Sequence, residues 1–346
     1  MAVKKIGQLG FADDLVGNRL GANATLERIG KLIDWGKVEA LLEDLHSSRY
    51  GRPAFPPLAL FKALLLQQWY ALSETKLEEA LGDRLSFRRF CGLSLEDSAP
   101  DQVTINRFRN LLVVEELVQP LFDEIVRQID ARGLILRQGT LIDASLVEAA
   151  VKRPKAPKDE DMTASDAEGE SAPDQTAQPR PASKLVRSPH DPDAAWAKKG
   201  GKRSFGYKAH IGADKGSAII RRAMLTPANV NDTVPADALY CGDEKAVYAD
   251  QAYSTKARSA KLKAAGIKDR TMSRANKHHP LTERQKTRNK AIGKRRGPVE
   301  QVFARLKGVY RWARVRYRGL ASNHAHLLLI CSAMNLRRMA VLTATD

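Results

Sequence analysis

Gly297-Pro-Val-Glu-Gln-Val-Phe-Ala-Arg-Leu-Lys307 is the stretch around which this chain is organised, because it keeps one carboxylate, Glu300, in the most basic part of the sequence. Residues 257–318 contain 20 Lys and Arg but 3 Asp and Glu, so this segment carries a formal charge of +17, equal to that of the whole chain. An acid kept among so many cations indicates a metal ligand beside a bound polyanion. A chance surface glutamate on a basic helix is the alternative.

Length and composition narrow the classes of protein. The 346 residues suffice for one large domain or two ordinary ones, and 43% hydrophobic residues allow a real core. Concentrated positive charge favours a nucleic-acid partner over a membrane surface or an acidic protein. The sequence has no run of about 18 apolar residues, so we expect no membrane span, and no signal peptide is evident. Cys91, Cys241 and Cys331 are widely spaced, which predicts a reducing cytoplasm without disulfides or a zinc site.

Short helical patterns dominate residues 1–133, which we expect to form a helical N-terminal domain for DNA binding or dimerisation. Residues 56–70 are apolar on nearly all sides and predict a buried helix. Ser73 or Thr75 is a candidate helix cap, and Gly92 would end another helix. Short helices with polar tips are typical of a helix-turn-helix-like module, with Arg107 and Arg109 as phosphate contacts. A domain for structural support explains the same pattern.

Residues 134–346 are expected to form a second domain of mixed α and β structure, interrupted at about 153–190. That insertion is rich in Pro, Ala, Ser and acids, which is typical of disorder. Strands are predicted over 134–147, 204–213, 217–225, 246–249 and 267–272. Helices are predicted over 234–240, 254–265 and 282–292, with Gly293 ending the last of these, then from Pro298 and over 323–343.

Three carboxylates occupy positions where one sheet could gather them. Asp143 lies in an apolar strand, where an unpaired acid is costly. Asp250 follows the strand 246–249 at the sheet edge where α/β sites form, and Glu300 lies in the first turn of a later helix. Carboxylates with few His or Cys partners suit Mg²⁺ or Mn²⁺, and two such ions about 3.5–4 Å apart would assist an in-line phosphoryl transfer. For Asp143 alone, a strand-ending turn is the alternative.

Five segments stand out in combination: Thr140-Leu-Ile-Asp143, Phe205-Gly-Tyr-Lys-Ala-His210, Thr226-Pro-Ala-Asn-Val-Asn-Asp232, Val247-Tyr-Ala-Asp-Gln-Ala-Tyr253 and Arg296-Gly-Pro-Val-Glu-Gln-Val-Phe-Ala-Arg-Leu-Lys307. Together they resemble the DDE transposases of the insertion-sequence-five family, within the insertion-sequence-four-like group. Residues 49–112 resemble that family's N-terminal domain. The resemblance implies an α/β fold, with a ribonuclease-H-like mixed sheet flanked by helices, and a divalent-metal triad of Asp143, Asp250 and Glu300.

The wider group's signature, Tyr-x2-Arg-x3-Glu-x6-Lys, matches at Arg296, Glu300 and Lys307, whereas Gly293 stands at the Tyr position. Seven positions after Glu300, Lys307 would share its helix face. An exposed face of ion pairs is the alternative explanation for these three residues.

Basic residues near the acids are the expected DNA contacts. In the second domain these are Lys199, Lys202, Arg203, Arg295, Arg296, Lys307, Arg314, Arg316 and Arg318. The first three belong to a segment that resembles a mobile DNA-contacting loop, for which a solvated charge run is the alternative. Trp312 lies among arginines and either stacks on an unpaired base or packs in the core.

These observations predict a DNA transposase that cleaves at element ends and transfers the freed strand into target DNA, with Mg²⁺ or Mn²⁺ as cofactor. A non-catalytic, transposase-derived DNA-binding regulator and a stand-alone metal-dependent nuclease are the alternatives. The expected partners are double-stranded DNA, as terminal inverted repeats and as target, and a second copy of the chain in a homodimer on DNA. No membrane partner is expected, and the expected location is a bacterial-type cytoplasm, on the nucleoid.

Overall fold

The computed structural model describes residues 3–8, 10–16, 22–46, 54–156, 188–199, 201–275 and 280–344. Two compact units divide the chain, one of Met1–Ile135 with Leu328–Asp346 and the other of Leu136–Leu327. The C-terminal residues therefore differ from the expected organisation, which assigned everything after residue 133 to the sheet domain. Most of the predicted insertion, residues 157–187, lies outside the described residues.

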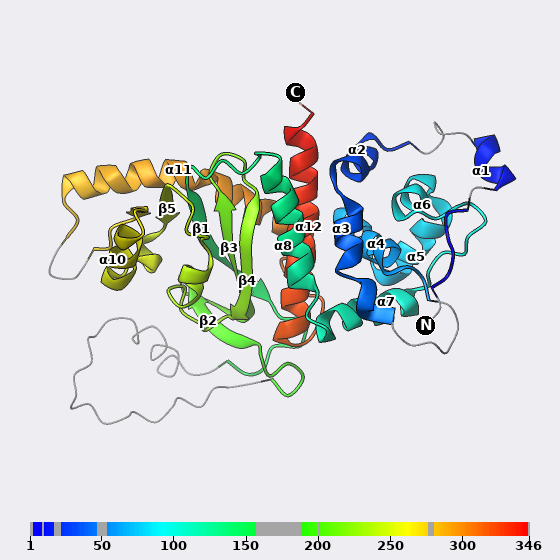
Figure 1. The fold of residues 1–346 in the computed structure, drawn as a ribbon. Helices are drawn as coiled ribbons and strands as arrows, with labels where there is room; N and C mark the ends of the chain where they lie inside the picture. Colours follow the sequence, from blue (N-terminus) through cyan, green and yellow to red (C-terminus); the bar gives the residue numbers. More distant parts are fainter. Residues whose placement is uncertain are drawn as a thin grey trace. The chain divides into compact units, whose positions relative to one another are not determined.

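The first unit is helical, as the sequence predicts. Its elements are α1 (Phe11–Val16), α2 (Ala24–Leu32), α3 (Trp35–Ala40), the 3-10 turn Glu43–His46, α4 (Pro57–Trp69), α5 (Glu74–Asp83), α6 (Leu85–Cys91), α7 (Gln102–Val114), α8 (Val118–Ala131) and the larger part of α12 (Leu320–Leu342) (Figure 1). The role of this unit in DNA binding or dimerisation stays a prediction.

Local capping explains where several of these helices begin and end. The Ser73 side chain accepts a hydrogen bond from the Lys76 amide at 3.2 Å, and Gly92 ends α6 in the left-handed conformation at φ +75°. The predicted buried helix is α4, and its Trp69 indole donates to the Ala333 carbonyl of α12 at 2.7 Å. The unit is thus closed by a segment from the far end of the chain.

The apolar helix α12 is long enough to cross a membrane, but 78% of its most apolar 18-residue window is buried in the protein. A buried core helix has the same length and composition. Its hydrophobic character is therefore weak evidence for a membrane partner.

The described residues of the second unit form a six-stranded mixed sheet. Its strands are β1 (Thr140–Glu148), β2 (Ala195–Lys199), β3 (Lys202–Asp214), β4 (Ile220–Pro227), β5 (Ala246–Ala249) and β6 (Lys268–Thr271). The order is β2-β3-β1-β5-β6, with β4 also pairing with β3 (Figure 1). Strand β3 runs antiparallel to its neighbours, whereas β1, β5 and β6 are parallel. This is the mixed sheet expected from the sequence.

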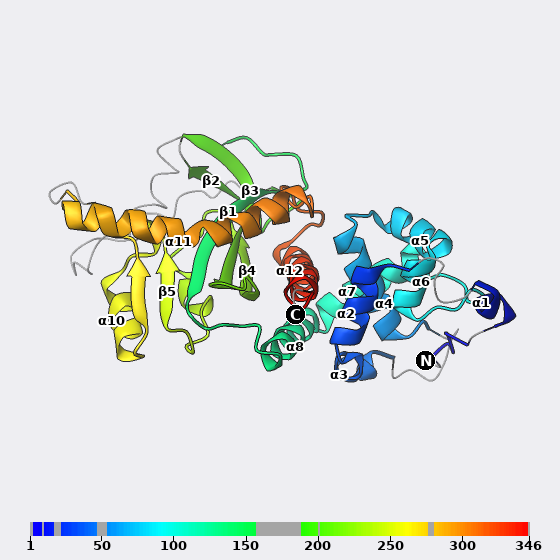
Figure 2. The same ribbon diagram turned by 90° about the horizontal axis from the view of Figure 1, so that it is seen from above.

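The two faces of the sheet bury different elements. On one face, Ile142, Val247 and Ala249 belong to a core cluster that includes Leu262 of α10 (Lys256–Ala264). On the other, α11 (Glu283–Gly308) contacts β1 and β5 (Figure 2). Because successive strand residues point to opposite faces, Asp143, which follows Ile142, points to the face of α11.

The predicted end of a helix at Gly293 and new start at Pro298 are wrong, because α11 continues through both residues to Gly308. The predicted capping box of Thr282 and Gln285 does begin it. Pro inside a helix costs about 3 kcal/mol and Gly about 1 kcal/mol. Each fully buried large apolar side chain contributes about 1.5–3 kcal/mol, which offsets that cost. The buried apolar side chains of α11 are Ile292, Val299, Val302, Phe303 and Leu306.

Three further predictions need correction. Instead of a mobile loop, the ends of β2 and β3 pair in an antiparallel ladder, Lys198 with Arg203 and Lys199 with Lys202. Only a 3-10 turn, Pro235–Ala238, replaces the predicted helix over 234–240. Stacking of Trp312 on a base is excluded, because its ring is 1% exposed and its indole donates to His326 Nδ1 at 3.1 Å. Its alternative, packing in the core, is confirmed.

Candidate active site

The positions of Asp143 and Asp250 relative to each other follow from the parallel register of β1 and β5. Thr140 pairs with Val247 and Leu141 with Tyr248, so continuing the register by two residues sets Asp143 beside Asp250. Asp250 keeps an extended backbone, with φ −78° and ψ 178°, before the chain enters a 3-10 turn. Two acids that are far apart in the sequence thus each stand two positions after the last residue pair that joins β1 and β5.

Arg296 reaches Asp143 from α11. Its Nη2 lies 3.2 Å from Asp143 Oδ1, and its side chain is 8% exposed against 20% for the acid. The Ala144 amide also donates to Asp143 Oδ1, at 2.9 Å. A guanidinium in this position offsets the charge of an acid that would otherwise be costly in a half-buried strand.

Tyr253 follows Asp250 by three residues and belongs to the core cluster that contains Ile142 and Leu262. Its ring is 1% exposed, and in the described part of the chain its hydroxyl has no hydrogen-bond partner. Burial raises the pKa of Tyr253, and the carboxylates of Asp232, Asp143 and Asp250 raise it further, whereas Arg296 opposes them. The one sequence signal for Tyr253 is that it ends the segment Val247–Tyr253, one of the five that resemble the transposase family.

Glu300 is exposed on α11, one helical turn after Arg296. Residues four apart on a helix share a face, so Glu300 projects from the side of α11 that carries the guanidinium bound to Asp143. Lys307 follows seven positions later on the same face and is half-buried. Because α11 is continuous, Arg296, Glu300 and Lys307 form one row.

The chemistry of the three acids suits a hard divalent cation, since all would offer carboxylate oxygens. Their ligand atoms do not all lie within 4.8 Å of one another, and in the described part of the chain such a group is found at Cys241, Asp243 and Glu244. Asp143 and Asp250 each accept a hydrogen bond from a nearby main-chain amide. Convergence of the three acids on a shared cation therefore stays a prediction.

The Cys241 group is an ion-pair network rather than a metal site. Glu244 is fully buried and accepts hydrogen bonds from the amides of Cys241 and Gly242 and from the Thr140 hydroxyl, at 2.6–2.8 Å. Its two oxygens are thus already occupied. Thr140 begins β1 and Glu244 precedes β5, so this network fixes the parallel register that aligns Asp143 with Asp250.

Asp243 completes the network between Arg221 and Arg137, at 2.8 and 2.7 Å. Burial by itself would raise its pKa, but hydrogen bonds from these two guanidinium groups lower the pKa of Asp243 to about 2. No residue of this network was among the site residues expected from the sequence, because no motif marks it.

The expected DNA contacts differ in their surroundings. Arg109 pairs with Glu74 at 2.6 Å, and Arg314 donates to the carbonyls of Ala149 and Ala150 at 2.9 and 2.7 Å, so both have structural partners. The exposed members are Arg107, Lys202, Arg295, Arg314 and Arg318, and the half-buried ones are Arg109, Arg203, Lys307 and Arg316. The side chain of Lys199 lies outside the described residues.

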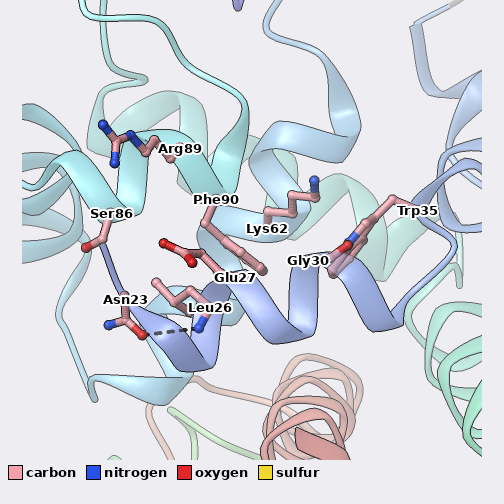
Figure 3. A pocket seen from close by; sticks show the side chains of 9 residues that line it. All are labelled: Asn23, Leu26, Glu27, Gly30, Trp35, Lys62, Ser86, Arg89 and Phe90. Atoms are coloured by element: carbon pink, nitrogen blue, oxygen red, sulfur yellow. Dashed lines mark hydrogen bonds between the residues drawn. The ribbon is translucent and has the colours of Figure 1, made fainter. Parts of the chain in front are cut away.

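A separate pocket of about 170 Å³ lies in the helical unit (Figure 3). The Lys62 ammonium lies 4.6 Å from the ring centre of Trp35 and 5.6 Å from that of Phe90, and burial lowers the pKa of Lys62. Cation–π contacts of this kind stabilise the packing of these helices. None of the three acids lines this pocket, so it is not part of the candidate site.

Comparison with known protein families gives two matches. The family described as Transposase DDE domain matches residues 136–336, more than half of the chain, and this range contains Asp143, Asp250 and Glu300. The family described as Transposase domain (DUF772) matches residues 15–111, in the helical unit. No solved structure matches the chain.

Proposed function

The chain belongs to the transposase DDE domain family, a family of phosphoryl-transfer enzymes, and from this we propose that it is a transposase of the insertion-sequence-five type. It would cut DNA at the ends of its element and join the freed 3′ ends to target DNA. The mixed sheet and its flanking helices form the ribonuclease-H-like fold of such domains.

The observation that carries this proposal is the pairing of β1 with β5, which supports a site at Asp143 and Asp250. The contact between Arg296 and Asp143 supports Glu300 as the third acid, because it anchors Glu300's helix against the strand. The arrangement suits phosphoryl transfer, since this chemistry depends on positioned oxygen ligands rather than on a protein nucleophile.

Divalent cations are implied by the family, and Mg²⁺ or Mn²⁺ held by Asp143, Asp250 and Glu300 would activate the attacking oxygen and stabilise the leaving 3′-oxygen. The protein's own part is to orient these acids. Arg296 holds Asp143 in place and offsets its charge, while Lys307 and Arg295 attract the phosphates of the DNA.

Two DNA ends must be held together for transposition, so we infer a homodimer on DNA. The DNA partners would be the terminal inverted repeats and the target duplex, in a bacterial cytoplasm. The chain's net charge of +17 supports a DNA partner, because cations that neutralise phosphates release counterions.

The test uses Asp143→Asn, Asp250→Asn and Glu300→Gln in the full chain, with Mg²⁺ and a duplex that carries the element's terminal repeat. Each variant is expected to lose strand cleavage and joining while it keeps DNA affinity. Glu283→Gln is the matched control, because this exposed acid lies on the same helix as Glu300 and pairs with Lys286.

Undiminished cleavage by one variant would remove that residue from the triad. DNA binding by the wild-type chain without Mg²⁺-dependent cleavage would identify a regulator instead. Cleavage without joining to a second duplex would identify a nuclease.

A further inference from the structure

A concave site of about 450 Å³ lies in the sheet unit, beyond the end of β1, and we call it the basic pocket. It is lined by Ala150, Val151, Lys152, His190, Arg316 and Arg318. Three of these side chains are cationic and none is acidic. We propose that the basic pocket binds a phosphate group of the DNA at a set distance from Asp143, an inference that rests on the proposed function.

The walls of the basic pocket are built by main-chain pairing. Segment 313–315 lies alongside the end of β1, where the Glu148 amide donates to the Ala313 carbonyl at 3.0 Å and the Val315 amide donates to the Glu148 carbonyl at 2.8 Å. Arg314 stabilises the same edge by donating hydrogen bonds to the carbonyls of Ala149 and Ala150. This pairing carries Arg316 and Arg318 next to Lys152, so the cations are brought together before any ligand binds.

Nearby acids have other partners. Glu148 pairs with Arg153 at 2.5 Å, and Asp193 accepts a hydrogen bond from the Leu320 amide at 2.8 Å. Asp191 is fully buried and accepts from the Tyr207 hydroxyl at 2.6 Å. The lining of the basic pocket contains Lys152, Arg316 and Arg318 and no acid, so an anion is the ligand whose charge complements it. Arginine pairs suit the oxygens of a phosphate, which the forked guanidinium can bind through two parallel hydrogen bonds.

The spacing of the basic pocket from the acids favours DNA as the source of that phosphate. Ala150 follows Asp143 by seven residues, and five of these steps lie in β1, so the two positions are at most about 23 Å apart. One DNA strand advances about 3.4 Å per nucleotide, so the same distance covers about seven nucleotides. A duplex whose scissile phosphate lies at Asp143 can thus present a second phosphate to the pocket.

The first experiment measures DNA affinity against salt for the variant Lys152→Gln/Arg316→Gln/Arg318→Gln. We expect its Kd to rise by about tenfold or more, as for the removal of charge-assisted hydrogen bonds, and its salt slope to fall by about one for each phosphate that the variant no longer neutralises. The matched control is Lys256→Gln/Lys263→Gln/Lys268→Gln, which removes the same charge from exposed lysines of α10 and β6. Its Kd should rise by clearly less than that of the pocket variant, because these lysines do not line the basic pocket.

The second experiment places single neutral methylphosphonates along the duplex. At a position about seven nucleotides from the cut, the substitution should weaken binding to wild type but not to the triple variant. Duplexes with and without a 5′-phosphate distinguish a terminal from an internal phosphate as the occupant.

Equal affinities and salt slopes for the pocket variant and its control would overturn this inference while leaving the proposed function intact. A methylphosphonate effect of the same size in wild type and variant would do so as well. Absence of any DNA binding by the wild-type chain would instead refute the proposed function, so the two failures are distinguishable.

Discussion

Replacing Arg296 by Gln removes the ion pair that ties α11 to the acid on β1. Both partners are mostly buried, at 8% and 20% side-chain exposure. Removing a hydrogen bond to a charged group costs about 1.5–3 kcal/mol, and Asp143 keeps the Ala144 amide as a second donor. We therefore expect Arg296→Gln to lower the free energy of unfolding by about 2 kcal/mol. At about 2–4 °C per kcal/mol for a unit of this size, Tm should fall by about 4–8 °C.

The assay is thermal unfolding in EDTA, followed by circular dichroism. Arg295→Gln is the matched control, because it removes the same charge from an exposed neighbour and should change stability by no more than about 0.5 kcal/mol. A double-mutant cycle with Asp143→Asn should give a coupling energy of about 0.5–3 kcal/mol. Saturating Mg²⁺ should reduce the difference in Tm between Arg296→Gln and wild type, since a bound cation supplies the missing positive charge beside Asp143. Identical melting of Arg296→Gln and Arg295→Gln, or a coupling energy near zero, would refute the ion pair.

Three further predictions concern the sheet unit. Burial lowers the pKa of His210 from 6.5 to about 4, so the folded protein holds the neutral imidazole. Because the unfolded chain binds the proton more readily, about 3 kcal/mol of stability that is fully present above pH 6.5 should be lost as pH falls through 4. Urea unfolding between pH 4 and 7 measures this change, and an unchanged pH dependence in His210→Gln would contradict it. Glu244→Ala should cost about 3 kcal/mol or more in urea unfolding, because buried donors lose their acceptor, and a cost below about 1 kcal/mol would count against the network. Gly212→Ala should lower the free energy of unfolding by about 1–3 kcal/mol, because its new methyl group meets the Leu239 carbonyl. Gly297→Ala has open space on α11 and should raise the free energy of unfolding by up to about 1 kcal/mol. Equal effects of the two substitutions on Tm would contradict this difference.

Local sequence signals predicted much of the framework. The capping box at Thr282 and the left-handed end at Gly92 are formed by residues adjacent in the chain, so propensity alone decides them. The buried run before Asp250 likewise predicted a strand with an acid at its end. The same rules failed at Pro298, where burial of one side of α11 overrides the breaker.

What the sequence determined by itself is the identity and local setting of Asp143, Asp250 and Glu300, since each depends on the pattern of a few neighbouring residues. Only the tertiary structure decided that Arg296 binds Asp143, that Glu244 fixes the register of β1 and β5, and that residues near 150, 190 and 316 share one pocket. Such contacts join positions more than a hundred residues apart or lie between separate strands. Their energies arise from packing and charge pairing in the folded state, and no local sequence pattern encodes them.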